Sequence, residues 1–409
     1  MDVELRPVTD DEFPEFARVL EGAFGFHATS DNVADMRSVT ELDRTIGAFD
    51  GPEIVATAGA YSFELTLPGG VLEPAAGVTF VAVRGTHRRR GLLRTLMEHQ
   101  LDDIADRGEC LALLTASESS IYRRFGYGPA TQQANWTIST EGTTLSVAPR
   151  DTGRLRLVER ADAAMLLPGV YEQCRRSIPG AVDRSDAWWD VYFKDREWDR
   201  DGASSRFYLI HESAAGEVDG FLAFRHRRGS EHSLPTGVLV VDELYGRDPE
   251  VEAALWQYAL DHDLVATVEA KGRPVDEPIR WRLADPRRLV CTDVVDALWV
   301  RPMDVARALA ARSYRIQDAL VVEVVDRMRP ANDGAYLVEG GPDGAEAHRT
   351  DRSADLSMDV ADLGTIYLGG VTATALARAG RIDERVPGAL ARADAFFGAA
   401  PLPWLTTGF

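Results

Sequence analysis

The sequence predicts an α/β protein built on a mixed sheet, and three observations support this. Residues 78–83 form a compact β-branched and aromatic run, which is typical of a strand. From Gly91 to about residue 107, apolar residues recur at spacings of three and four, which predicts a helix. Residues 111–115, LALLT, predict a buried strand, and ASESSIYRRFGYG predicts a short helix capped by serine. This strand–helix–strand–helix order places the expected chemistry at the carboxyl ends of strands.

The rest of the chain predicts two further domains, because 409 residues exceed what one hydrophobic core usually serves. A polar, turn-rich stretch at residues 141–154 suggests the first boundary. Beyond it, a hairpin is predicted for FYLIH and DGFLAFRHR, and a strand is predicted for GVLVVDEL. A helix is predicted for DPEVEAALWQYALDHD, with Asp248 as its cap and Pro249 in its first turn. ELYGRDPE precedes this helix where a basic turn would be needed, so we expect no phosphate site there. Another strand and helix are predicted in LWVRPMDVARALAAR, where the third domain begins. We therefore predict domains at residues 1–150, 151–295 and 296–409.

Composition excludes several classes of function. The formal net charge of -20 argues against nucleic acid as a partner and would attract a cationic small molecule or basic peptide. No apolar run is long enough to span a membrane and the amino terminus is too acidic for a secretory signal, so we expect no membrane span and a cytoplasmic location. Cys110, Cys174 and Cys291 are far apart without a C-x-x-C pair, which predicts buried thiols and no metal site.

The segment HRRRGLLRTLM, residues 87–97, concentrates positive charge where the predicted strand passes into the predicted helix. A helix start presents several backbone N–H groups to one point, and the neighbouring guanidinium groups add charge-assisted hydrogen bonds, which together suit a phosphate. The segment lacks the G-K-[ST] of a P-loop and the G-x-G-x-x-G of a dinucleotide-binding turn. Since nearly all the cationic residues of this chain are arginines, a solvated arginine face is the alternative interpretation.

The same residues resemble a known family. R-R-R-G-L-L is similar to the [QR]-x-x-G-x-[GA] pyrophosphate turn of the GNAT acyltransferases, with Arg88 and Gly91 at matching positions. Leu93 replaces the usual small residue, as it does in the Eis (enhanced intracellular survival) acetyltransferases. The chain resembles that family in four segments, namely VTFVAVRGTHRRRGLLRTLM, LLTASESSIYRRFGYGPAT, DALWVRPMDVARALAARSY and PLPWLTTGF. The resemblance covers nearly the whole chain. It implies two GNAT-like mixed-sheet domains in tandem, the second degenerate, followed by an α+β domain similar to sterol carrier proteins.

The resemblance also implies acetyl-CoA as co-substrate and a set of residues that bind it. The backbone of the strand would pair with the pantetheine arm, the basic turn would bind the phosphates, and two residues of the next turn would lie near the cofactor. These residues are Val81, Ala82 and Val83, then Arg88, Arg89, Arg90, Gly91, Leu92, Leu93 and Arg94, and finally Ser117 and Glu118. The alternatives are a core strand at the first group and a helix cap at Ser117.

Two catalytic residues follow from the resemblance. Tyr122 matches the tyrosine of the family motif Y-x-x-x-G-[FY] and would give a hydrogen bond or a proton to the departing thiolate. Tyr127 is a local competitor for this role. The carboxylate of Phe409 would enter the active site as general base, and docking of the tail as mere packing is the alternative.

For the acceptor, the resemblance implies amino groups of cationic molecules such as aminoglycosides, lysine side chains or short peptides. Phe24, Phe26 and His27 lie in the region where the family builds part of this pocket. We expect direct attack of the amine on the thioester in a ternary complex, without a metal. We also expect a homo-oligomer, because the resemblance implies assembly as a hexamer. Two other functions stay open at this point, a CoA-binding or acyl-CoA-binding regulator without turnover and a lipid carrier acting through the carboxyl-terminal domain.

Overall fold

The structure is a computed structural model that describes residues 3–150, 153–231 and 234–409. The chain divides into two compact units, which we describe separately. Unit 1 contains Met1–Thr131, Pro179–Val182 and Asp296–Phe409. Unit 2 contains Gln132–Ile178 and Asp183–Val295.

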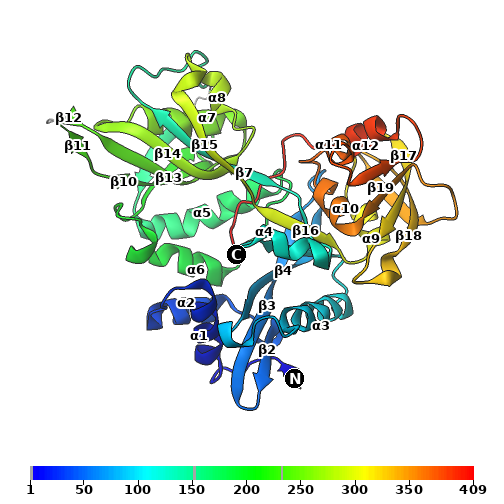
Figure 1. Cartoon of the computed structure of the whole chain (residues 1–409). Coiled ribbons are helices and arrows are strands. Elements are labelled where there is room, and N and C mark those ends of the chain that lie inside the picture. Colours follow the sequence, from blue (N-terminus) through cyan, green and yellow to red (C-terminus); the bar gives the residue numbers. More distant parts are fainter. Residues whose placement is uncertain (1–2, 151–152, 232–233) are drawn as a thin grey trace. The chain divides into compact units, whose positions relative to one another are not determined.

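The amino-terminal part of unit 1 is a seven-stranded sheet with helices around it (Figure 1). The strand order is β1-β2-β3-β4-β5-β16-β6, and β4 and β5 are parallel while the other neighbours are antiparallel. Its elements are β1 (Glu4–Arg6), α1 (Phe13–Phe24), α2 (Ser30–Val39), η1 (Leu42–Arg44), β2 (Thr45–Asp50), β3 (Glu53–Thr66), β4 (Leu72–Val83), η2 (Gly85–His87), α3 (Leu92–Asp106), β5 (Leu111–Thr115), α4 (Ser119–Tyr122), η3 (Arg123–Phe125), β6 (Gly128–Pro129) and β16 (Leu298–Pro302).

Helices α1 and α3 cover opposite faces of this sheet. Successive side chains of a strand point to opposite faces. On β3, Ile54 packs in one cluster with α1 residues that include Phe16, whereas its neighbour Val55 packs in another with Leu92 and Leu96 of α3. The sheet is therefore buried on both sides, and the turn that begins α3 lies at the carboxyl end of β4.

The carboxyl-terminal part of unit 1 is a five-stranded sheet of order β19-β18-β17-β20-β21 with four helices. A single apolar cluster joins its strands to its helices, with Leu320, Val338, Ile366 and Phe396 fully buried. Its elements are α9 (Val305–Ala311), β17 (Asp318–Val325), η6 (Pro330–Asn332), β18 (Gly334–Gly341), β19 (Gly344–Arg349), β20 (Leu356–Asp359), α10 (Val360–Ile366), α11 (Ala373–Arg378), β21 (Ile382–Glu384) and α12 (Ala389–Phe397).

Unit 2 contains a second seven-stranded sheet, of order β15-β7-β14-β13-β10-β9-β8. The predicted hairpin is confirmed as β9 and β10, and Asp248 caps α7 by accepting hydrogen bonds from the backbone N–H groups of Glu250 and Val251. The elements are β7 (Gln132–Ser139), β8 (Arg154–Val158), α5 (Arg160–Arg175), α6 (Asp186–Lys194), η4 (Glu197–Asp199), β9 (Phe207–Glu212), β10 (Val218–Arg227), β11 (Ser230–Glu231), β12 (Leu234–Pro235), β13 (Gly237–Gly246), α7 (Pro249–Leu260), β14 (Val265–Pro274), α8 (Ile279–Arg282), η5 (Pro286–Arg288) and β15 (Leu289–Asp296).

Most of the predicted elements of the first domain are present, with one local error. The strand at residues 78–83, the helix from Gly91 and the strand at residues 111–115 correspond to β4, α3 and β5. The short helix is not capped by serine, because the residue at its N-cap position is Glu118 and no side chain of the described residues caps it.

The predicted domain boundaries at 150 and 295 stay a prediction. The first of them adjoins residues 151–152, which lie outside the described residues. Strand β7, which precedes residue 150, belongs to the sheet of unit 2, and β16, which follows residue 295, lies between β5 and β6 in the first sheet.

Two of the three cysteines are buried as predicted, and Cys291 is exposed because it lies on the edge strand β15. Within residues 3–150, 153–231 and 234–409, no cluster of His, Cys, Asp or Glu side chains could hold a metal ion. In the same described ranges, none of the helices combines the length and the apolar character that crossing a membrane requires.

Glu252 of α7 gives a prediction about stability. Desolvation, with a smaller contribution from the nearby carboxylate of Glu277, raises the pKa of Glu252 to about 7 from its ordinary value of 4.5. Between these two pH values the native state keeps a proton that the unfolded state has lost, so stability falls as the pH rises from about 4.5 to about 7. Replacing Glu252 by glutamine is therefore expected to increase the free energy of unfolding by about 2 kcal/mol at pH 8 and by little at pH 5.

Urea unfolding at the two pH values measures this difference. Glu250→Gln is the matched control, because a hydrogen bond from Arg282 lowers the pKa of Glu250 and its replacement brings no stabilisation at pH 8. An equal effect of Glu252→Gln at both pH values would show that Glu252 does not hold its proton in the native state.

Candidate active site

The turn between η2 and α3 brings backbone donors and cationic side chains to one place. Arg89 and Gly91 both have positive φ angles, 64° and 87°, and Gly91 is the N-cap residue of α3. A Cβ atom on Gly91 would meet nothing within 4 Å, so the glycine is needed for its backbone conformation and not for close approach. No side chain of the described residues caps α3, which leaves its first N–H groups available to a ligand.

The carboxyl-terminal part of β4 has an open edge toward β5. The two parallel strands are paired only from Ala76 to Val78 on β4, and β4 continues to Val83. At Phe80 the chain has a φ of 57°, and the register between β3 and β4 shifts at this bulge. The backbone of Val81–Val83 therefore has one edge bonded to β3 and one edge open, which is the arrangement that an extended amide chain can join as an extra strand.

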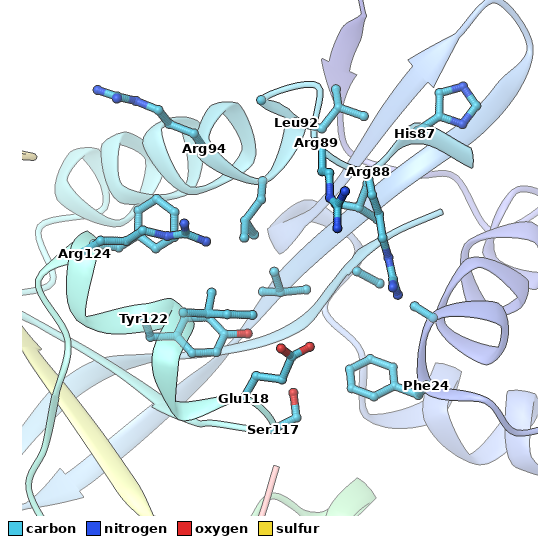
Figure 2. Close-up of a pocket in the computed structure, with 18 of the residues that line it drawn as sticks. Phe24, His87, Arg88, Arg89, Leu92, Arg94, Ser117, Glu118, Tyr122 and Arg124 are labelled. Atoms are coloured by element: carbon cyan, nitrogen blue, oxygen red, sulfur yellow. The ribbon is translucent and has the colours of Figure 1, made fainter. Parts of the chain in front are cut away.

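A cavity of about 920 Å³ lies beside this open edge and the basic turn. Figure 2 shows Arg88 and Arg89 reaching into it from the turn, with Ser117, Glu118 and Tyr122 on the opposite wall. In the described part of the chain, neither Arg88 nor Arg89 has a carboxylate partner. The residues that line the cavity are Ala23, Phe24, Val81, Ala82, Val83, His87, Arg88, Arg89, Gly91, Leu92, Leu93, Arg94, Ser117, Glu118, Ile121, Tyr122, Arg124, Phe125 and Met328.

A smaller cavity of about 290 Å³ shares four lining residues with the larger one. It brings Tyr122 and Phe409 together at the point where β4 and β5 separate. Its lining residues are Phe24, Val78, Thr79, Phe80, Val81, Leu114, Thr115, Ala116, Ser117, Tyr122 and Phe409. The two sets share Phe24, Val81, Ser117 and Tyr122, so the two cavities adjoin at these residues.

Tyr122 is buried, and its hydroxyl points into the larger cavity (Figure 2). Burial raises the pKa of its hydroxyl above the ordinary value of 10, and the carboxylate of Glu118 adds a smaller increase. The competitor Tyr127 is fully buried in the core and lines neither cavity. Its hydroxyl has no hydrogen-bond partner among the described residues. Of the two tyrosines, Tyr122 is therefore the one that lines both cavities.

The end of the chain is docked in unit 1. Trp404 and Leu405 are buried, and the backbone N–H of Trp404 donates to the carbonyl of Pro179. The ring of Phe409 packs on Phe63 with ring centroids 4.9 Å apart. A terminal oxygen of Phe409 accepts a hydrogen bond of 2.6 Å from the hydroxyl of Thr115, at the carboxyl end of β5.

Some predicted site residues lie outside the cavities or are otherwise engaged. Arg90 and Phe26 line neither cavity, and Arg94 lines the larger one while pairing with Glu98 at 2.8 Å. Residues that the sequence reasoning missed are His87, Ala23, Ile121, Arg124, Phe125 and Met328. Arg124 and Phe125 are within the tyrosine motif and could have been found there, whereas Met328 lies more than 200 residues from the other lining residues and no pattern marks it.

The domain content agrees with this geometry. Residues 4–130 and residues 180–316 each match an acetyltransferase (GNAT) domain, and residues 305–406 match a sterol carrier protein domain. An uncharacterized N-acetyltransferase of Streptomyces avermitilis is 41% identical over 100% of both chains. The N-acetyltransferase Eis of Mycobacterium tuberculosis is 31% identical over 97% of both chains. The chain belongs to the Eis family of GNAT N-acetyltransferases.

Solved structures support the assignment to the Eis family. The crystal structure of Eis1 from Mycobacterium abscessus is 34% identical and has a TM-score of 0.88, covering 99% of this chain and 100% of that one. A GCN5-related N-acetyltransferase from Anabaena variabilis, 19% identical with a TM-score of 0.86 over 100% of both chains, shows the same fold. The predicted order of two GNAT domains and a sterol-carrier-like domain is confirmed, and the protein is an acyltransferase.

Proposed function

We propose that the protein transfers the acetyl group of acetyl-CoA directly to an amine in a ternary complex. The observation that carries this proposal is the joint lining of one small cavity by Tyr122 and Phe409, next to the open edge of β4. Binding the two substrates side by side would accelerate the reaction through proximity. No nucleophilic side chain is required for this reaction.

In this proposal the larger cavity binds CoA. The open backbone edge of Val81–Val83 pairs with the amide groups of the pantetheine arm. The pyrophosphate meets the first N–H groups of α3, with Arg88 and Arg89 as charge-assisted donors. Arg90 and Arg94 serve the outer phosphate, since both are exposed and the exposed pair of Arg94 with Glu98 costs little to break.

The chemical step uses two groups of this chain. The ammonium group gives a proton to the carboxylate of Phe409, and the neutral amine nitrogen then attacks the thioester carbonyl carbon. The C–S bond breaks, and the second proton that the nitrogen loses ends on the CoA thiol. Tyr122 donates a hydrogen bond to the departing thiolate. Since a thiol has a pKa of about 8.5 and burial raises the pKa of Tyr122 above 10, complete proton transfer from Tyr122 is uphill, and the hydrogen bond is its larger contribution.

The acceptor in this proposal is a primary amine on a cationic molecule, such as an aminoglycoside, a lysine side chain or a short peptide. The net charge of -20 favours the approach of a cation. Among the described residues that line the smaller cavity there is no Asp or Glu, so the carboxylate of Phe409 would be the group that holds the ammonium group and takes its proton. Phe24, which lines both cavities, would pack against the acceptor. Assembly as a homo-oligomer, a hexamer by the family resemblance, is the corresponding proposal for the quaternary structure.

Arg89 allows a test of the phosphate site. Replacing Arg89 by alanine is expected to weaken CoA binding by about tenfold, because a charge-assisted contact contributes on the order of 1.4 kcal/mol. The loss should shrink as the salt concentration rises, since salt screens exposed charges. Isothermal titration calorimetry at two salt concentrations measures both effects. Arg287→Ala, at an exposed arginine of η5, is the matched control, and equal affinities of all three proteins would contradict this placement of the phosphates.

Initial-velocity kinetics test the mechanism. CoA release is followed while acetyl-CoA and an amine, drawn from a panel of aminoglycosides and lysine peptides, are both varied. A ternary complex gives reciprocal plots that intersect. Parallel plots would indicate an acetylated enzyme and would contradict direct transfer.

A further inference from the structure

The carboxyl-terminal part of unit 1 contributes a wall to the larger cavity. Met328 lies just after β17, yet it lines this cavity together with residues of the amino-terminal sheet. It packs partly buried against the cluster that contains Tyr122 and Phe125. Neither the family resemblance nor the proposed function gives this residue a role.

A buried ion pair fixes the loop that carries Met328. The carboxylate of Asp326 accepts two hydrogen bonds from the guanidinium of Arg301, at 3.0 and 2.9 Å, and both side chains are fully buried. The same carboxylate accepts the backbone N–H of Met328 at 3.1 Å and a side-chain hydrogen bond from Asn332 at 2.9 Å. Because a buried carboxylate with this many donors cannot move without leaving charges unpaired, the position of Met328 is strongly determined.

The same pair also reaches the segment that carries Tyr122. Arg301 donates from Nε to the carbonyl of Phe125 at 2.7 Å, three residues after Tyr122. A second contact comes from Asp362 of α10, which is buried and accepts two hydrogen bonds from Arg123 at 2.9 and 2.7 Å. Two independent ion pairs therefore attach the Tyr122 segment to the carboxyl-terminal part of unit 1.

The place of Met328 in the cavity indicates which part of CoA it would meet. In the proposed binding mode, the open edge of β4 pairs with the pantetheine arm, and the basic turn binds the pyrophosphate. Among the other lining residues, Leu93, Ile121, Phe125 and Met328 belong to one apolar cluster, and Arg94 and Arg124 are cationic. Figure 2 shows Arg94 on α3 and Arg124 on the segment after α4, both on the side of the view opposite Phe24. Apolar and guanidinium groups of this kind suit a purine ring that carries a phosphate.

We infer that Met328 contacts the adenosine end of CoA and that Asp326, through its pair with Arg301, is the positioning residue that holds Met328 there. The inference rests on the proposed use of CoA by the larger cavity. It makes the sterol-carrier-like domain a component of the donor site through Met328, whereas Phe409 lines the smaller cavity.

Calorimetry with two ligands tests this inference without any acceptor. CoA contains the adenosine end, and 4′-phosphopantetheine lacks it. Met328→Ala is expected to weaken CoA binding by about fivefold and to leave the affinity for 4′-phosphopantetheine unchanged, because only CoA reaches this wall. Met165→Ala is the matched control, since Met165 of α5 is 74% exposed. Equal affinities of wild type and Met328→Ala for CoA, or an equal loss for both ligands, would overturn the contact.

Asp326→Asn tests the positioning role. We expect a loss of CoA affinity at least as large as that of Met328→Ala, again without a change for 4′-phosphopantetheine, and a double variant no weaker than Asp326→Asn alone. A general loosening of the structure would weaken both ligands and would contradict a positioning role. Failure of wild type to bind either ligand would instead overturn the proposed function, so the two outcomes are distinct.

Discussion

Replacing Tyr122 by phenylalanine is expected to lower kcat by about 10²-fold while the KM for acetyl-CoA changes by less than about twofold, because the hydroxyl acts mainly as the bond to sulfur breaks. The ring keeps its place in the cluster with Phe125, so the variant should fold like wild type. The rate of CoA release at saturating amine measures the effect. Since burial raises the pKa of Tyr122, the hydroxyl stays protonated and the wild-type rate should show no decline from this group below about pH 10.

Tyr127→Phe is the matched control for this experiment. It removes the same atom from a tyrosine whose ring lies 6.4 Å from that of Tyr122 but which lines neither cavity. The Tyr127 hydroxyl has no hydrogen-bond partner among the described residues, so its removal should leave kcat within about twofold of wild type. If Tyr122→Phe retains half of the wild-type kcat, or if Tyr127→Phe is the slower variant, the assignment of the donor is wrong.

Extending the chain by two glycines after Phe409 is expected to lower kcat by at least about 10²-fold. The extension converts the terminal carboxylate into a neutral amide and forces additional chain into a cavity of about 290 Å³. The hydrogen bond from Thr115 and the packing of Phe409 on Phe63 would be disturbed by the added residues. CoA release with the best amine of the panel is the measurement.

The same two glycines placed before Met1 provide the control for the added length. Calorimetric binding of CoA should be unchanged in the extended protein, because Phe409 lines only the smaller cavity. Full activity of the extended protein would contradict a catalytic carboxylate at Phe409 and would leave tail packing as its role.

The sequence predicted the parts of this protein that depend on local patterns. The periodicity after Gly91 and the β-branched run before it predicted α3 and β4, since each element is specified by its own residues. The family resemblance carried by Arg88, Gly91 and the tyrosine motif implied a set of site residues, most of which line two adjoining cavities, although Arg90 and Phe26 line neither.

The sequence could not predict features that depend on pairing between distant segments. Strand β16 reads as the start of a new domain, but it completes the first sheet beside β5 because its partner strands are supplied by residues nearly 200 positions earlier. The open edge of β4 follows from a register that ends at Val78, which no local pattern specifies. Met328 lies at the cavity in a loop whose backbone is bonded to Asp326, the buried partner of Arg301, and no local sequence pattern marks that long-range pairing. Cys291 was predicted to be buried because its neighbours in the sequence are apolar. It is exposed because strand β15 lies at the edge of its sheet, and that position depends on pairing with a distant segment.

Transfer of an isotopically labelled acetyl group tests the central claim most directly. The full chain is incubated with acetyl-CoA labelled in the acetyl group and with each amine of the panel, and the products are identified by mass spectrometry. We predict that at least one cationic amine gains the label as free CoA appears in equal amount, with no label on the protein, and that Tyr122→Phe slows both products together. Label that stays in acetyl-CoA with every amine, or that accumulates on the protein, would contradict direct acetyl transfer at this site.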